Sequence, residues 1–288
     1  MPRTSFMTIS YAPDFERCKR LCESFDSFVK GYEHHLICPK SDLHLFEKLA
    51  APHRKISTYQ DILPRRYWKI PFTKKWWLDP SFFPVRGWIL QQLLKIASAA
   101  KAYSEDVYFL DSDLYFFKPF DPANLIEDGN TRLYAINKKA PSKLHAKWQS
   151  VSEQLFGLTN ETFHTDYIGQ IISWKVTNVQ EMIHKIEEVT KKPWYIALGH
   201  TFTFSEYLLY GNFVERVLGK NNGHVVRDYA LSFDIWNKEE FITAYENSIQ
   251  IPTESCAILI QSNLGIDINE ENALLRKLIK NLEIPSIK

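Results

Sequence analysis

Cysteine is scarce in this chain and does not follow a disulfide or metal-binding pattern. The 288 residues include four cysteines, at positions 18, 22, 38 and 256. Small domains held together by disulfides are far richer in cysteine, and zinc sites place their ligands in closely spaced pairs. Cys18 and Cys22 share one face of an expected helix, but a metal site would need two further ligands. We therefore expect the thiols to pack in the core of a protein from a reducing cytoplasm.

An excess of one charge and a long apolar run are also lacking. The chain has 35 basic and 34 acidic residues and a net charge of +1, which argues against nucleic acid as a partner. No segment approaches the roughly 20 apolar residues of a membrane-spanning helix, and the first residues do not form a signal peptide. We expect a cytoplasmic protein whose contact with the inner face of a membrane is at most peripheral.

Short apolar segments alternate with amphipathic ones along the chain, and 45% of the residues are hydrophobic. This pattern predicts an α/β fold with a mixed, mainly parallel sheet and helices on both faces. Strands are expected at residues 5–11, 34–39, 106–117, 132–137, 167–175 and 255–262, and helices at 15–29, 43–50, 87–103, 179–192, 201–218 and 269–284. Residues 58–86 are dense in proline and aromatics and are expected to form an irregular connection beside a ligand site. Without repeats or a linker, residues 1–288 are expected to form one domain.

The segment VYFLDSDLYFF, residues 107–117, carries two aspartates two positions apart in a strand-like context. In one continuous strand, the side chains of Asp111 and Asp113 would emerge on the same side, with that of Ser112 opposite. The Cα atoms of the two aspartates would lie roughly 6 to 7 Å apart. Two adjacent carboxylates are unfavourable unless a cation joins them, and oxygen ligands suit Mg²⁺ or Mn²⁺ carrying a diphosphate. In open α/β sheets the ligand crevice lies beyond the carboxyl ends of the strands. The motif therefore predicts a metal and diphosphate site.

An apolar strand ending in Asp-x-Asp, behind a buried helix with an arginine before it, resembles the nucleotide-diphospho-sugar transferases of the GT-A fold. Further segments resemble a group of bacterial proteins of uncharacterised function placed among GT-A glycosyltransferases: TISYAPDFERC, VRGWILQQLLK, FLDSDLYFFKPF, YIGQIISWK and FSEYLLYG. The resemblance covers residues 5–265. It implies a Rossmann-like domain with a nucleotide-binding half over about 1–120 and a sugar- and acceptor-binding half over about 121–288.

The resemblance also implies a reaction. A sugar would pass from a nucleoside-diphosphate sugar, with a UDP-sugar favoured, to a hydroxyl of a glycan or lipid-linked acceptor, in bacterial surface polysaccharide or glycolipid synthesis. Contacts to the nucleotide-sugar are expected from Ser10, Tyr11, Asp14, Arg86, Lys95, Asp111 and Ser112. Asp14 has a second interpretation, because it could only cap the helix that follows it. Lys95 and Arg86 are the basic groups nearest in sequence to the motif and could neutralise the diphosphate.

Catalytic and metal-binding residues are less well defined by the sequence. Glu206 stands among aromatic residues, which could raise the pKa of its carboxyl for base catalysis, and Asp166 competes for this role. Asp111 and Asp113 are the expected ligands of Mn²⁺ or Mg²⁺. The resemblance implies a histidine as the third ligand, and we prefer His224 to His200 because the glycine before His224 permits a close backbone approach.

Several alternatives remain open. The Asp-Ser-Asp segment could be an ordinary turn whose carboxylates bind backbone amides. Haloacid-dehalogenase-type phosphatases also place Asp-x-Asp after an apolar strand, with one aspartate as nucleophile. A carbohydrate- or nucleotide-binding protein of the same fold could lack catalysis altogether.

Two segments suit contact with a membrane surface. Residues 69–88 combine Lys74 and Lys75 with several tryptophans and phenylalanines, and the terminal helix has leucines on one side, ending at Leu282. Aromatic and basic side chains together favour a lipid headgroup layer, where a lipid-linked acceptor would reside. Packing onto the domain is the alternative role for both segments.

Overall fold

A five-stranded sheet forms the centre of the protein in the computed structural model, which describes residues 3–73, 75–137, 142–159, 165–247 and 249–280. Its strands are β1 (Thr4–Ile9), β2 (Glu33–Cys38), β3 (Arg54–Thr58), β7 (Asp106–Phe109) and β13 (Ile172–Lys175). They lie in the order β13-β7-β1-β2-β3. β7, β1, β2 and β3 are parallel, and β13 pairs antiparallel with β7 at one edge. The prediction of a mixed, mainly parallel sheet is confirmed.

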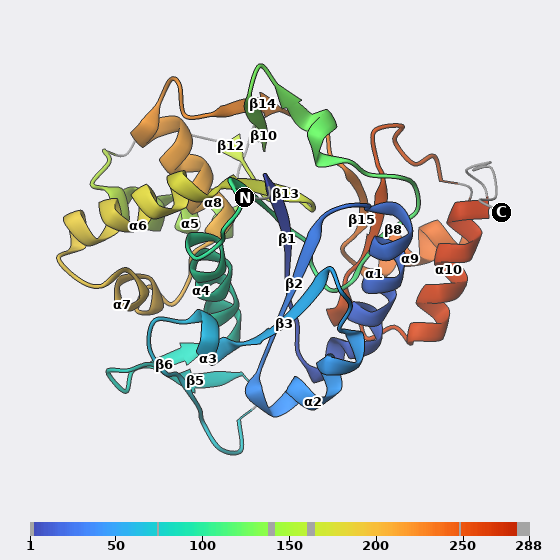
Figure 1. Ribbon diagram of the computed structural model, residues 1–288, viewed down its shortest axis with the longest axis horizontal. Coiled ribbons are helices and arrows are strands. Elements are labelled where there is room, and N and C mark those ends of the chain that lie inside the picture. Colours follow the sequence, from blue (N-terminus) through green and yellow to red (C-terminus); the bar gives the residue numbers. More distant parts are fainter. Residues whose placement is uncertain (1–2, 74, 138–141, 160–164, 248, 281–288) are drawn as a thin grey trace.

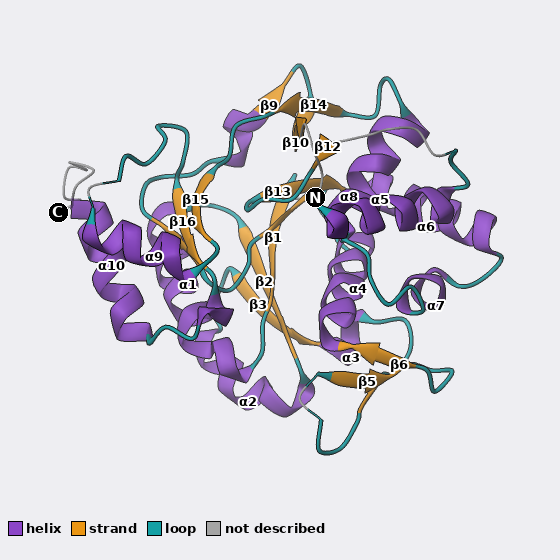
Figure 2. Ribbon diagram, turned by 180° about the vertical axis from the view of Figure 1, so that it is seen from behind, coloured by secondary structure: helices purple, strands orange, loops and turns teal. Residues whose placement is uncertain are grey.

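Helices cover both faces of this sheet, as Figure 2 shows. On one side lie α1 (Phe15–Phe28), α2 (Leu43–Phe46) and α10 (Ile268–Lys280), and on the other lie α4 (Gly87–Ala100), α6 (Val176–Thr190) and α8 (Glu206–Asn212). Every residue of β1 is buried. A strand covered on both faces has no side turned to solvent, which explains why β1, with the sequence TSFMTI, contains apolar and hydroxyl residues but no charged ones.

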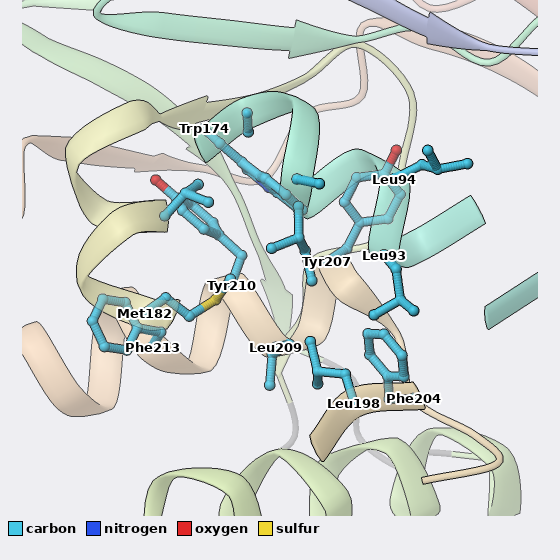
Figure 3. Packing of buried hydrophobic residues seen from close by; sticks show 14 of the residues in the cluster. Leu93, Leu94, Trp174, Met182, Leu198, Phe204, Tyr207, Leu209, Tyr210 and Phe213 are labelled. Carbon is cyan, nitrogen blue, oxygen red and sulfur yellow. The ribbon is translucent and has the colours of Figure 1, made fainter. Parts of the chain in front are cut away.

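The core on the α4 side is built around Trp174 of β13. The Trp174 ring stacks on the ring of Tyr210 from α8, with 4.8 Å between their centroids, and meets the edge of Phe109 at 4.7 Å. Figure 3 shows the rings of Trp174 and Tyr210 with Leu93 and Leu94 of α4. Aromatic packing of this kind adds to the free energy of burial, so α4 and α8 are fixed against the end of β7.

Directly after β7 the chain enters a second sheet. It consists of β8 (Leu114–Phe116), β15 (Ser232–Ile235) and β16 (Ala257–Ile260), in the order β15-β16-β8, and it packs with α9 (Lys238–Glu246) and α10. The prediction of one strand over 106–117 is therefore wrong. Because the chain leaves one sheet for another, it turns at Asp111, whose carbonyl accepts from Leu114 N at 3.1 Å.

The segment predicted to be irregular contains ordered structure, so that prediction is also wrong. After the short helix α3 (Tyr59–Ile62) come β4 (Trp68–Lys69), β5 (Trp76–Leu78) and β6 (Pro84–Arg86). These strands form a small antiparallel sheet, beside the start of α4 at the lower edge of Figure 1. Lys74 lies outside the described residues.

The remaining elements complete the other half of the protein. The strands are β9 (Ile126–Glu127), β10 (Asn130–Tyr134), β11 (Ile136–Asn137), β12 (Thr165–Asp166) and β14 (His224–Arg227), and the helices are α5 (Lys143–Phe156) and α7 (Trp194–Gly199), with a π-helical turn over Phe213–Leu218. β14 pairs in parallel with β10, and β11 pairs antiparallel with β12. Leu282, expected on the terminal helix, lies outside the described residues. None of the helices in the described ranges combines the length and hydropathy needed to cross a bilayer.

Candidate active site

Asp111 lies at the carboxyl end of β7 with both carboxylate oxygens engaged. Lys95 Nζ donates to Oδ1 at 3.1 Å, and Gln170 Nε2 donates to Oδ2 at 3.0 Å. The Asp111 side chain is still 30% exposed. The register that pairs Met7 with Phe109 starts the loops after β1 and β7 at the same edge of the sheet. Asp111 thus lies at the edge of the sheet where parallel sheets bind ligands.

Lys95 joins Asp111 to a buried polar cluster. Its ammonium lies 3.0 Å from Glu206 Oε1, donates to the Tyr207 hydroxyl at 2.8 Å and sits over the Tyr207 ring. Burial alone would lower the pKa of Lys95, but the charge of Asp111 and the neighbouring Tyr207 and Glu206 outweigh it and hold this pKa well above its usual range. Lys95 is therefore a permanent cation behind Asp111.

Asp113 is more deeply placed than Asp111. Its side chain is buried, and its Oδ2 accepts from Ser262 N at 2.8 Å. Burial, together with the negative charge of Asp111, raises the pKa of Asp113 to about 7. Ser112 between them is also buried. The charge of Asp111 thus opposes the ionisation of Asp113. The carboxylate of Asp113 binds a backbone amide, as the turn interpretation expects.

Asp14, after β1, belongs to the same charged surroundings. It occupies the N-cap position of α1, yet its side chain makes no capping hydrogen bond. Its Oδ1 lies 3.8 Å from Arg17 Nη1, and Arg17 also bonds to Glu271 of α10 at 2.7 Å. Burial raises the pKa of Asp14, and the charge of Arg17 opposes that rise. The charge of Asp14 contributes in turn to the raised pKa of Asp113.

The other residues predicted around the nucleotide lie at different depths. Ser10 is buried beside the end of β1, where its backbone amide donates to Ile37 O at 3.0 Å, whereas Tyr11 is 48% exposed. Arg86 is an exposed residue at the N-cap of α4. Ser10, Tyr11, Asp14 and Lys95 share the edge of the sheet with Asp111.

Neither histidine is brought to the aspartates. In His224, Nε2 accepts from the Tyr210 hydroxyl at 2.7 Å and Nδ1 donates to Thr131 O at 3.0 Å. Thr131 bonds to Asp106, the first residue of β7, and the five residues from Asp106 to Asp111 span about 16 Å. His200 bonds to Asp79 at 2.8 Å.

The two residues predicted to be catalytic lie in separate surroundings. Glu206 is the buried partner of Lys95, at the start of α8. Asp166 is buried on β12, where its Oδ1 accepts from Ile168 N at 3.0 Å and its Oδ2 lies 3.4 Å from His145 Nε2.

Two residues of this region have no counterpart in the sequence analysis. Gln170 donates to Asp111 and lies just before β13. Nothing in the sequence indicates that this polar side chain is buried. Asp234 on β15 is partly buried, and burial raises its pKa to about 6, with the charge of Asp111 adding to the rise and the Ser232 hydroxyl opposing it. From the sequence, no strand is predicted over Ser232–Ile235, so there is no signal for Asp234.

Among the described residues, no group of three histidine, cysteine, aspartate or glutamate side chains is arranged to hold a metal ion. Mg²⁺ is commonly bound by one or two carboxylates, with water and substrate phosphates filling the other positions. The charge of Asp111 raises the pKa of Asp113. Two carboxylates arranged in this way fit an ion bound with water and phosphate oxygens.

Comparison with known proteins gives a family for this chain. A sequence search among curated proteins finds no match. One similar solved structure is the crystal structure of mouse xyloside xylosyltransferase 1, apo form, with 12% identity and a TM-score of 0.46 over 92% of this chain and 100% of that chain. Nothing about the reaction follows from a likeness at this level. The sequence model of DUF6492, described as a family of unknown function, matches residues 4–283. The chain therefore belongs to the DUF6492 family.

Proposed function

We propose that the protein is a metal-dependent glycosyltransferase that moves a sugar from a nucleoside-diphosphate sugar to a hydroxyl acceptor. The observation that carries this proposal is the pairing of Asp111 and Asp113 at the carboxyl end of β7, where the negative charge of one raises the pKa of the other. A divalent cation relieves this repulsion, and a diphosphate supplies further oxygen ligands. A UDP-sugar is the favoured donor, as the resemblance of the sequence implies.

Asp111 and Asp113 would hold Mn²⁺ or Mg²⁺. When bound, the ion would neutralise the charge that develops on the leaving diphosphate. His224 is left out of this proposed site because both of its ring nitrogens bond to Tyr210 and Thr131. Lys95 orients Asp111 by a 3.1 Å hydrogen bond, so we assign it a positioning role in place of direct contact with phosphate.

The nucleotide would lie along the loop after β1. The exposed ring of Tyr11 is available to stack on the base, and Asp14, which makes no capping bond, can accept from ribose hydroxyls. Ser10 would shape this loop without touching the nucleotide, because its side chain is buried and its backbone amide donates to Ile37 O. Arg86 is exposed at the start of α4, from where its long side chain could approach the donor.

The acceptor would bind on the side of β12 and β15. Asp166 remains the proposed base for the acceptor hydroxyl, and Asp234, whose pKa is raised to about 6, is a second acid in reach of the charge of Asp111. Glu206 is paired with Lys95 at 3.0 Å, so it would act on the reaction only through that lysine. Stabilising the leaving group and positioning the acceptor would supply catalysis, through an oxocarbenium-like transition state.

A glycan or lipid-linked acceptor fits a role in surface polysaccharide or glycolipid synthesis, on the cytoplasmic side of a membrane. The alternative is a nucleotide- or carbohydrate-binding protein without catalysis. One observation favours that alternative, since both Asp111 oxygens already bond to protein groups. The sequence speaks against a phosphatase of the haloacid-dehalogenase type, because Leu114, Tyr115 and Phe116 follow the motif, where those enzymes usually carry threonine or valine.

Calorimetric titration with UDP, with and without Mn²⁺, tests the proposal. The transferase should bind UDP with Mn²⁺ and lose that binding in Asp113→Asn. Asp128→Asn is a matched control, because Asp128 is an exposed turn residue with a φ of 48°, which asparagine also adopts. A screen of nucleotide-sugars for Mn²⁺-dependent hydrolysis then separates catalysis from binding. UDP affinity that is unchanged by Mn²⁺ and by Asp113→Asn would exclude the metal site.

A further inference from the structure

Four aromatic side chains form an exposed edge beside the small sheet of β4, β5 and β6. Their exposed fractions are large: Trp68 37%, Phe72 109%, Phe82 72% and Phe202 55%. The ring of Phe82 stacks on Trp68 with 5.7 Å between centroids, and Phe83 links this pair to Phe202 at 5.3 Å. We call these four residues the aromatic edge. Trp68, Phe82 and Phe202 lie around the turn between β5 and β6, whereas Phe72 lies on the turn between β4 and β5. Exposed apolar rings gathered on one small sheet mark a contact site.

Three of these residues have a backbone conformation that phenylalanine rarely adopts. Phe72, Phe82 and Phe202 have φ angles of 60°, 62° and 58°. Glycine or asparagine would occupy this left-handed region with less strain, and a bulky side chain there costs conformational energy. Strain that persists at exposed positions points to a role for the side chains themselves. Folding alone does not require three large rings directed into solvent.

The turn that presents Phe82 is held rigidly. The buried carboxylate of Asp79 accepts from the backbone amides of Ser81 at 2.8 Å and Phe83 at 2.9 Å, and from His200 Nε2 at 2.8 Å. His200 also stacks on Phe83, with 4.1 Å between centroids. These contacts fix the β5–β6 turn to the end of α7. The rings are therefore arranged before any partner arrives, which lowers the entropy lost on binding.

The charge around the aromatic edge has one sign. Between residues 62 and 88 the exposed described side chains include five cations: Arg65, Arg66, Lys69, Lys75 and Arg86. The one acidic residue in that stretch of sequence is Asp79, which is fully buried. The chain as a whole has a net charge of only +1. The basic residues are thus concentrated where the aromatic rings are exposed.

We propose that the aromatic edge and its surrounding cations dock onto the surface of a bilayer containing anionic lipids. Aromatic rings settle at the boundary between headgroups and acyl chains, and lysine and arginine are attracted to anionic headgroups. The edge adjoins the start of α4, the helix that carries Lys95 and leads to Asp111. If the proposed function holds, docking would keep the protein at the membrane that carries a lipid-linked acceptor.

Sedimentation with lipid vesicles tests the docking without any sugar donor. The wild-type protein should bind vesicles of phosphatidylcholine with about 30% phosphatidylglycerol, and bind phosphatidylcholine alone much more weakly. Binding should fall about tenfold between about 0.05 M and 0.5 M NaCl, because salt screens the headgroup charge. The emission of Trp68 should shift to shorter wavelength as its ring leaves water.

The double variant Phe72→Asn with Phe82→Asn should lower vesicle affinity roughly tenfold or more, while asparagine relieves the left-handed backbone. Tyr103→Asn is the matched control, because Tyr103 is 81% exposed beyond the other end of α4. Arg65→Gln with Arg66→Gln should remove most of the salt dependence. Circular dichroism and UDP titration on each variant separate a loss of docking from a loss of folding or of the proposed nucleotide site.

Three results would overturn the docking proposal. They are a wild-type protein that ignores anionic vesicles, a double phenylalanine variant that binds them like Tyr103→Asn, and binding of the aromatic edge to soluble glycans in place of vesicles.

Discussion

The ammonium of Lys95 and the carboxylate of Glu206 lie 3.0 Å apart, and both side chains are only 7% exposed. The same ammonium reaches Asp111 at 3.1 Å. One buried cation therefore balances a buried carboxylate on one side and a carboxylate of the candidate active site on the other. The stability of the fold and the geometry of the site depend on one group.

Replacing this cation tests that dependence. Lys95→Met leaves Glu206 without a counter-charge in the core, and breaking a buried ion pair on one side typically costs about 3 to 5 kcal/mol. We expect the free energy of unfolding to fall by that order in urea titrations.

The matched comparison is Lys95→Met combined with Glu206→Gln. Removing the unpaired charge of Glu206 should restore at least about 1 kcal/mol of the lost free energy of unfolding. A single Lys95→Met variant within about 1 kcal/mol of wild type would show that the pair contributes little.

Asp113→Asn should have opposite effects on activity and stability. If the proposed function holds, metal-dependent donor hydrolysis should fall about 10²- to 10³-fold, as when a group that stabilises transition-state charge is removed. The pKa of Asp113 in the folded protein, about 7, is raised above its ordinary value of 3.8. Its contribution to stability is therefore complete below pH 3.8 and is lost as the pH rises through 7.

At pH 8 the asparagine variant should consequently melt at a higher temperature than wild type, and at pH 5 the difference should shrink. Scanning calorimetry at both pH values measures this, with Asp128→Asn as the neutral control. A lower melting temperature for Asp113→Asn at pH 8 would contradict the assignment of a repelled carboxylate.

His224 should make the protein sensitive to mild acid. Burial lowers the pKa of His224 from 6.5 to about 4. Between these two pH values the unfolded chain therefore binds a proton on this histidine, and the folded chain does not. Stability from this residue is present above pH 6.5 and is lost as the pH falls toward 4, by at most about 1.4 kcal/mol per pH unit.

His224→Gln should flatten that part of the stability profile, as measured by urea unfolding across the pH range. The variant also tests the role predicted from the sequence, because Mn²⁺-dependent UDP affinity should stay within about threefold of wild type, a difference of less than 1 kcal/mol. A large loss of that affinity would restore His224 as a metal ligand.

Gly211 in α8 has no room for a side chain. A Cβ there would lie 2.3 Å from Cγ of Tyr167, whose ring is buried and whose hydroxyl bonds to Glu215. Gly211→Ala should cost about 1 to 3 kcal/mol of unfolding free energy through overpacking. Gly199→Ala is the control, since its nearest contact would be an ordinary 3.7 Å. Equal stability of the two variants would show that Tyr167 moves aside freely.

The sequence correctly predicts those elements whose structure depends on a local pattern of residues. The segment HHLICP at residues 34–39 predicts a strand, and β2 occupies Glu33–Cys38. The helix expected over 87–103 is α4. The position of Asp111 at the end of a central strand also follows from the sequence, because the apolar run before it has only one place in an α/β sheet.

Other features depend on contacts that the sequence does not display. Residues 106–117 have the same apolar content whether they form one strand or two strands in different sheets, so the break after Phe109 is not visible. The hydrogen bond of Gln170 to Asp111 joins residues 59 positions apart. The preference for His224 rested on the glycine before it, and that glycine instead makes room for Lys175, whose Cδ would lie 2.7 Å from a Cβ at Gly223.

The hydrogen bond from Ser262 N to Asp113 ties the acidic turn to a segment 149 positions further along the chain. During synthesis, both aspartates emerge long before the backbone amide that fixes one of them. Until β16 pairs with β8, the turn has no sheet on its far side and the two carboxylates are not held together. A nascent or truncated chain that ends before β16 therefore lacks the amide that holds Asp113, so its acidic turn is incomplete.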